Sequence, residues 1–90
     1  MLNINPSSVF KKDRRRCINR GYDMGLLAAV INTLTIPAPL PPNNKDHGLS
    51  GNWVGFQECH ISPDWLLIYR VAGNDLYLAR TGTHADLFGK

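Results

Sequence analysis

Three histidines and one aspartate stand where a small protein often displays its chemistry. His47 lies in a polar segment, His60 ends an apolar run, and His84 opens a short segment near the C-terminus. Asp64 lies in a Ser-Pro-Asp-Trp sequence that predicts a turn. Histidine can both accept and release a proton near neutral pH. If the fold brings these four side chains together, they predict acid–base catalysis.

Two other interpretations use the same residues. The histidines could be scattered over the surface, and Asp64 could serve the turn alone, because aspartate is common in turns. Three histidines and an aspartate are also suitable zinc ligands. Their long, irregular spacing and the absence of a His-x₃-His pair argue against a zinc site, so no metal is expected.

Four further side chains could bind a nucleic acid. Trp65 and Phe88 could stack on bases, although Trp65 could equally belong to the core. Arg80 lies at the end of an expected strand and could hold a phosphate beside the histidines, as could Arg70. The basic residues near the N-terminus could also contact phosphates, but a run of charges is usually a solvated face.

The composition limits the function classes. The chain has 90 residues, a formal net charge of +3 and a pI of about 9.1, which suits an acidic or polyanionic partner. Cys17 and Cys59 could pair in principle, but two cysteines without a secretory signal are more often buried thiols. The apolar run Leu26–Leu34 is too short to span a bilayer. We therefore expect a cytoplasmic protein with no membrane partner.

The first part of the chain predicts a helical hairpin. Asn5 and Pro6 suit a helix start, and the helix should end near Arg20, with Gly21 in a left-handed cap. Asp23 should cap a second helix. The expected apolar faces hold Phe10, Cys17 and Ile18 on the first helix and Leu27, Val30, Ile31 and Leu34 on the second.

The remaining segments predict strands. The expected strands are Met1–Ile4, Trp53–Ile61, Trp65–Val71 and Asp75–Arg80, and the proline-rich Ile36–Asn44 should be an extended connector. Thr83 and Asp86 form a capping-box pattern that should start one helical turn. The order β-α-α-β-β-β predicts an α+β fold, an antiparallel sheet with the helical hairpin packed on one side. Residues 1–90 are expected to form a single domain.

Three stretches resemble a known family. They read KDHGLSGNW, ECHISPDWLLIYR and RTGTHADLFG, and they cover 45–89 closely. This pattern is similar to the RelE/ParE toxin superfamily, and within it to the YafQ-type mRNA interferases of type II toxin–antitoxin systems. The resemblance implies a RelE-like fold. It also implies a ribosome-dependent endoribonuclease that cuts translated mRNA in the A site and so inhibits translation.

The resemblance also implies roles for individual residues. In this family a 2′-hydroxyl attacks the neighbouring phosphate without a metal or other cofactor. The family's motif residues fall here on His47, His60, Asp64, His84 and Phe88, with Trp65 beside them. His84 is the first choice for the general acid and His60 or His47 for the base. Asp64 would position a histidine, Phe88 would stack on a codon base, and Arg80 would stabilise the phosphate.

Partners and alternatives follow from the same likeness. The expected partners are the ribosome, mRNA and a cognate antitoxin, itself a DNA-binding protein with an acidic or amphipathic segment. Val54 and Gln57 replace basic residues of some relatives, so the preference of the family for adenine-rich codons could differ here. A gyrase-directed or non-catalytic toxin of the same fold, and a His/Asp metal-binding protein, remain alternatives.

Overall fold

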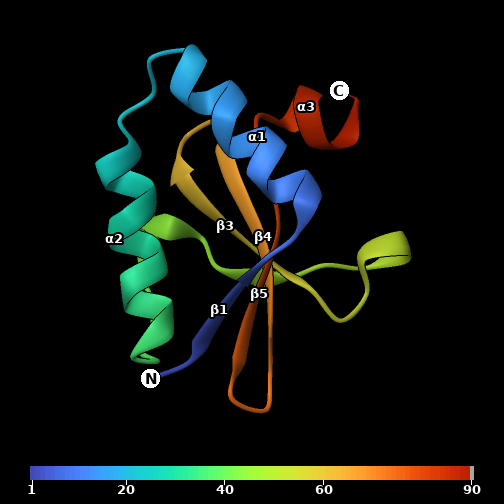
Figure 1. Cartoon of the computed structure of the whole chain (residues 1–90). Helices are drawn as coiled ribbons and strands as arrows, with labels where there is room; N and C mark the ends of the chain where they lie inside the picture. Colours follow the sequence, from blue (N-terminus) through green and yellow to red (C-terminus); the bar gives the residue numbers. More distant parts are fainter. Residues whose placement is uncertain (90) are drawn as a thin grey trace.

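A five-stranded sheet carries two helices on one face, as the computed structural model of residues 1–89 shows (Figure 1). The elements are β1 (Asn3–Pro6), α1 (Ser8–Asn19), α2 (Met24–Thr35), the 3₁₀ turn η1 (Pro42–Asn44), β2 (His47–Gly48), the 3₁₀ turn η2 (Gly51–Trp53), β3 (Gln57–Ser62), β4 (Trp65–Ala72), β5 (Asp75–Gly82) and α3 (His84–Phe88). The predicted α+β order is confirmed.

The sheet has the strand order β1-β5-β4-β3-β2. All neighbouring pairs are antiparallel except β1 and β5, which run parallel. The expectation of a fully antiparallel sheet is therefore wrong for its first strand. After β1 the chain passes through both helices and three strands before β5, and this long connection permits a parallel pair.

Helix α1 begins later than its sequence predicts. Pro6 remains in β1, paired with Leu78, and the Ser7 N–H donates to the Leu78 carbonyl. Ser7 is therefore the N-cap, and its hydroxyl accepts from the Phe10 N–H at 2.9 Å. The strand pairing thus takes precedence over the local helix-start signal of Asn5 and Pro6.

The two helices meet at a tight link. Gly21 has φ +79° and its N–H donates to the Ile18 carbonyl, while the Tyr22 N–H donates to Cys17, as in a Schellman cap. The Asp23 side chain then accepts from Gly25 N–H and starts α2. The predicted caps at both positions are confirmed.

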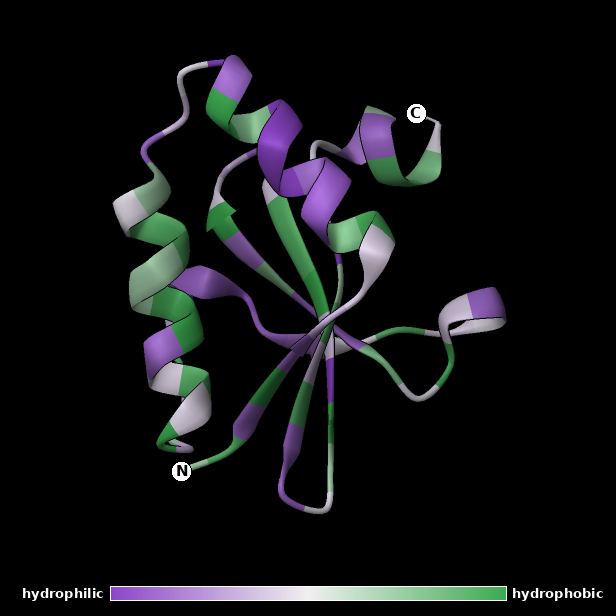
Figure 2. Cartoon of the chain, in the orientation of Figure 1, coloured by the Kyte–Doolittle hydropathy of each residue, from purple (hydrophilic) through white to green (hydrophobic). Residues whose placement is uncertain are grey.

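The core lies between the helices and the sheet. Alternate side chains of the strands face it, among them Cys59, Trp65, Leu67, Tyr69, Leu76 and Leu78, and they meet Phe10, Cys17, Leu27, Val30 and Leu34 of the helices. Ile18, expected on this stripe, is 45% exposed, and buried Asp13 takes a place on the core-facing side of α1. In Figure 2 the central strand β4 is largely green, whereas α1 has long purple segments.

Two predictions for the middle of the chain need correction. Trp53 belongs to η2, and β3 begins only at Gln57. His47, expected in a loop, lies in the short strand β2 and pairs with Glu58. Gly73 and Asn74 form a two-residue hairpin turn between β4 and β5, because Ala72 pairs directly with Asp75. No helix within residues 1–89 is long and apolar enough to cross a membrane.

Candidate active site

Asp64 and His84 form the most closely bonded pair of the site. The turn between β3 and β4 carries Asp64, and its Oδ1 accepts from the backbone N–H of His84 at 3.0 Å and from His84 Nδ1 at 2.6 Å. These two bonds, the backbone one first, hold the pKa of the Asp64 carboxyl below its usual range. An ionised carboxylate only accepts, so Nδ1 of His84 carries the proton and Nε2 faces away from Asp64.

The other two histidines surround a buried carboxylate. Nε2 of His47 lies 3.5 Å from Oε1 of Glu58, and Nε2 of His60 lies 3.9 Å from the same oxygen. The ring centroids of His60 and His84 are 5.8 Å apart. The structure therefore brings His47, His60, Asp64 and His84 into one continuous cluster, as the sequence analysis requires.

Glu58 is the residue of this cluster that sequence reasoning missed. Its side chain is only 7% exposed, yet it contacts two histidines. Glu58 and His60 are two positions apart on β3, so both project from the same face of the sheet. Strand periodicity could have found it, because an acidic residue at that spacing from a functional histidine shares its face.

Hydrogen bonds fix the segment that carries His47. The Tyr69 hydroxyl donates to Asp46 Oδ1 at 2.6 Å, and Asn44 Nδ2 donates to the His60 carbonyl at 2.7 Å. His47 Nδ1 donates to the Lys45 carbonyl at 2.7 Å, which turns its Nε2 toward Glu58. Burial, together with the bond to Asp46, raises the pKa of the Tyr69 phenol, so the anchor stays a donor over the physiological range.

An arginine clamp holds the short helix that carries His84. Asp86 closes a capping box by accepting from the Thr83 N–H at 3.0 Å, and its carboxylate also receives two bonds from Arg20, at 2.6 and 3.0 Å. Arg16 lies 3.3 Å away. The Arg20 bonds, above all, hold the pKa of the Asp86 carboxyl well below its ordinary range. The clamp ties α3 to the end of α1.

Arg80, which the sequence predicts as a phosphate ligand, forms an ion pair with Asp13. Its Nε and Nη2 donate to Asp13 at 2.7 and 3.0 Å, and Asp13 is buried on α1. Asp13 also accepts from the Thr81 N–H at 3.3 Å, on the part of β5 beyond the end of β1. The carboxylate neutralises much of the arginine's charge, so the phosphate contact predicted for Arg80 is weaker than that of an unpaired arginine.

Trp65 belongs to the core. It is 3% exposed, its indole N–H donates to the Thr81 hydroxyl at 2.9 Å, and its ring packs against Tyr22 at 4.9 Å between centroids. The prediction that Trp65 stacks on a base is therefore wrong for this conformation. Trp65 instead anchors the turn that carries the preceding Asp64 to the core. Phe88 is half-buried on α3, four residues after His84, and its stacking role stays a prediction.

Both cysteines are buried free thiols, as expected. Burial is also the main reason why the pKa of the Cys59 thiol rises to about 12 and that of Cys17 rises from its ordinary value. Neither thiol ionises near neutral pH, so neither is a candidate nucleophile or general base.

Comparison with known proteins identifies the family. The family model described as "Bacterial toxin of type II toxin-antitoxin system, YafQ" matches residues 2–89. The chain belongs to the YafQ toxin family. It is 41% identical over 87 residues to the mRNA interferase toxin YafQ of Escherichia coli K12, and the match covers 96% of this chain and 95% of that one.

Solved YafQ-family structures share the fold. A crystal structure of YafQ from E. coli BL21(DE3) has a TM-score of 0.94 and 39% identity, covering 99% of this chain and 100% of that one. The matching chain of an E. coli DinJ–YafQ complex has a TM-score of 0.91 and 40% identity, covering 99% of this chain and 100% of that one. A copper-bound mutant toxin from Helicobacter pylori has a TM-score of 0.94 and 43% identity, covering 98% of this chain and 100% of that one.

Proposed function

We propose that this chain is the toxin of a type II toxin–antitoxin system and an mRNA interferase that cuts translated mRNA on the ribosome. The YafQ relationship supports the class, and the cluster of His47, His60, His84, Glu58 and Asp64 supports the chemistry. The observation that carries the proposal is the approach of His60 and His84, with ring centroids 5.8 Å apart. Two imidazoles at this separation can serve opposite ends of one reacting phosphate.

The proposed reaction is a metal-independent phosphoryl transfer within the RNA. A base removes the proton of a ribose 2′-hydroxyl, the oxygen attacks the adjacent phosphorus, and the bond to the 5′-oxygen of the next nucleotide breaks. An acid returns a proton to that leaving oxygen. The products are a 2′,3′-cyclic phosphate and a free 5′-hydroxyl.

His84 suits the acid and His60 or His47 the base. Asp64 fixes His84 through Nδ1, so Nε2 is the atom available to the leaving group. Glu58 lies between His47 and His60 and positions both rings. Proton transfer of this kind supplies about 10²–10⁴-fold, and in-line placement of the attacking oxygen must supply much of the rest.

The proposed dependence on the ribosome follows from size. A 90-residue domain has little surface with which to grip RNA, whereas the ribosome already holds the codon extended. The exposed basic side of α1, which includes Lys11, Lys12 and Arg15, suits a polyanion or an acidic antitoxin segment. A relative was solved in complex with the antitoxin DinJ, and we propose an antitoxin partner for this chain as well.

Mapping of 5′ ends on a translated message tests the proposal. We expect a ladder of cuts locked to the reading frame, with 5′-hydroxyl ends, that disappears when the start codon is removed. Cuts of equal strength on the untranslated message would contradict ribosome dependence. No cuts, together with inhibited supercoiling by gyrase, would favour the gyrase-directed alternative.

A second candidate function is metal binding at the same cluster. Three possible ligand atoms lie within 4.8 Å of one another, one each from Glu58, His60 and His84. Two imidazole nitrogens and a carboxylate oxygen suit zinc or copper, whose ligand distances of about 2.0–2.2 Å require only modest side-chain rotation. Metal-bound toxins are known from Helicobacter pylori. Such an ion would occupy the nitrogens that the nuclease needs.

Chelation separates the two functions. The nuclease proposal predicts that toxin stripped with EDTA, which is then removed before the ribosomal assay, cleaves at an unchanged or higher rate, and that added zinc lowers this rate. Activity that vanishes with EDTA and returns with zinc would instead identify a metal-dependent hydrolase. Elemental analysis of the purified protein, compared with His60→Gln, reports whether the cluster holds the ion.

A further inference from the structure

Arg70 is held between two aromatic rings on the surface of the sheet. Its guanidinium carbon lies 5.7 Å from the centroid of Phe56 and 5.4 Å from that of Tyr77. Trp53 packs edge-on against Phe56, with centroids 5.3 Å apart. We call Phe56, Arg70 and Tyr77 the stacked triad. Neither the acid–base chemistry nor the core uses it.

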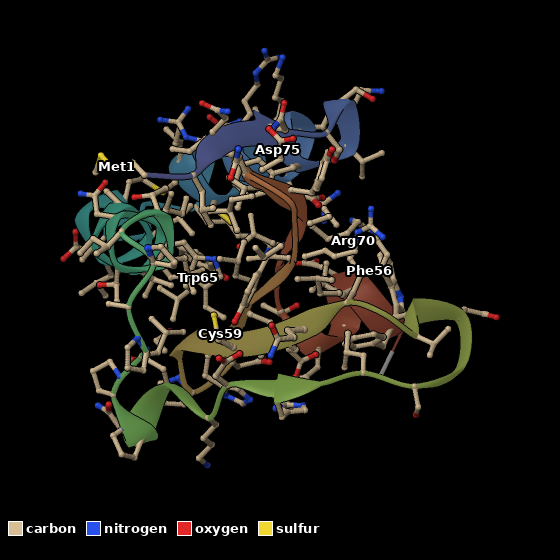
Figure 3. All side chains as sticks on the ribbon, turned by 90° about the horizontal axis from the view of Figure 1, so that it is seen from below. Met1, Phe56, Cys59, Trp65, Arg70 and Asp75 are labelled. Carbon is tan, nitrogen blue, oxygen red and sulfur yellow. The ribbon has the colours of Figure 1, made fainter. Side chains whose placement is uncertain are left out.

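The stacked triad lies on the same face of the sheet as the histidines. Arg70 pairs with Tyr77, and Phe56 precedes Gln57, the partner of Tyr69, so the three side chains stand in one row across the strands. Phe56 and His60 are four residues apart along one strand direction, a distance of about 13 Å. Figure 3 shows Arg70 and Phe56 together, on the side of the sheet away from α2.

This row is open to solvent and carries an uncompensated charge. Arg70 is exposed, Tyr77 is 37% exposed, and neither makes an ion pair within residues 1–89. A groove of about 420 Å³ runs past them and is bordered by Asn5 and Ser7. Arg80 is the opposite case, since its guanidinium donates two hydrogen bonds to Asp13.

We propose that the stacked triad is a binding subsite for single-stranded RNA next to the nucleotide that is cut. The inference rests on the proposed function, because it places the flanking part of the same RNA. Aromatic faces stack on bases of any sequence, and an arginine beside them binds the phosphate or stacks in turn. The distance of about 13 Å to the histidines suits a short extended segment of a strand.

A purely structural role makes a different prediction. An exposed cation–π contact adds a small amount to stability, and its loss would lower the melting temperature slightly without changing affinity for RNA. An RNA subsite predicts instead a clear loss of affinity for RNA in variants that remain folded.

Fluorescence anisotropy with a labelled oligoadenylate RNA of about ten nucleotides separates these roles. The His84→Gln background prevents cleavage during the titration. We expect Arg70→Ala and Tyr77→Ala each to weaken binding roughly tenfold, within the range for loss of one stacking side chain. Tyr77→Phe, which keeps the ring, should bind like the parent. Arg14→Ala removes the same charge from α1, on the side of that helix next to α2, and is the matched control.

Each alternative outcome has a defined meaning. Absence of saturable binding by the parent, or equal losses for Arg70→Ala and Arg14→Ala, overturns the inference. Unchanged RNA affinity with lost affinity for an acidic antitoxin would make this row a protein interface, which also overturns it. Cleavage assays keep the proposals distinct. If Arg70→Ala leaves the KM for translated mRNA unchanged while the histidine variants are inactive, only the subsite fails.

Discussion

On the face of the sheet covered by α1 and α2, the strands present Leu67, Leu76 and Leu78, which are at most 2% exposed. On the opposite face, β3, β4 and β5 present His60, Arg70 and Tyr77, each at least partly open to solvent. Alternation along the strands separates the two sets of side chains. The covered face is closed by apolar packing, whereas the open face keeps polar atoms available.

Bonding of the charged groups follows the same division. Asp13, on the covered side, accepts bonds from Arg80 and Thr81, and no buried side-chain nitrogen or oxygen within residues 1–89 lacks a partner. In the histidine cluster, the outward Nε2 of His84 has no bonded partner in the described part of the chain. Changes on the covered face should therefore reduce stability, and changes on the open face should reduce activity.

Truncation of Leu67 should give the largest effect on stability. Leu67 is fully buried in the core cluster, so Leu67→Ala should lower the free energy of unfolding by about 2–5 kcal/mol. Urea denaturation measures the loss. Cleavage per folded molecule, assayed below the melting transition, should remain near that of the wild type. A large loss of activity in folded Leu67→Ala would break the division between the faces.

Replacement of Asp64 should reduce activity with little effect on stability. Asp64 is exposed and bonds only His84 among the groups described here. Asp64→Asn keeps the shape but removes the carboxylate charge beside His84, whose ring must carry protons on both nitrogens to act as the acid from Nε2. We expect a roughly 10²-fold lower kcat. Equal activity of Asp64→Asn and wild type would show that His84 does not need this partner.

Loss of Arg20 tests whether the Asp86 clamp serves the site. Arg20→Ala removes two bonds that tie α3 to α1 but leaves the Arg16 ion pair and the capping box intact. Looser placement of His84 should lower kcat roughly tenfold. Arg14→Ala, which removes the same charge from an exposed position of the same helix, should retain full activity. Restoration of most activity by Arg20→Lys would support a positioning role, and a shift of the melting temperature alone would not.

Acid should weaken the same clamp. The folded pKa of Asp86 lies below its unfolded value, so its contribution to stability is complete above about pH 4 and is lost as the pH falls toward the folded pKa. Melting temperatures between pH 7 and pH 3 should fall more for the wild type than for Asp86→Asn, by a few degrees. Parallel curves for the two proteins would contradict the role of Arg20 in holding this carboxylate.

The elements could be predicted because local signals agree with the fold. The helix ends predicted from Asp23, Gly21 and the Thr83 capping box are all confirmed. The start of α1 could not be predicted, because pairing of Pro6 with Leu78 is a contact between residues far apart in the sequence. Such long-range pairing overrides a local cap preference.

Most residues of the site could be predicted from the sequence, but their hydrogen-bond and ion-pair partners could not. His47, His60, Asp64 and His84 came from residue type and family motif, whereas Glu58 entered only when the register placed it between two histidines. Asp13, the partner of Arg80, lies 67 residues away in sequence. The role of Trp65 as a core residue follows from its burial. Pairing and burial depend on the tertiary structure.

Single-turnover cleavage of ribosome-bound mRNA by His84→Gln tests the central claim most directly. The account predicts a rate at least roughly 10²-fold below that of the wild type, at saturating toxin, with an unchanged melting temperature and unchanged affinity for the ribosome. A rate within a factor of about two of the wild type would contradict the assignment of the open-face histidines as the catalytic groups.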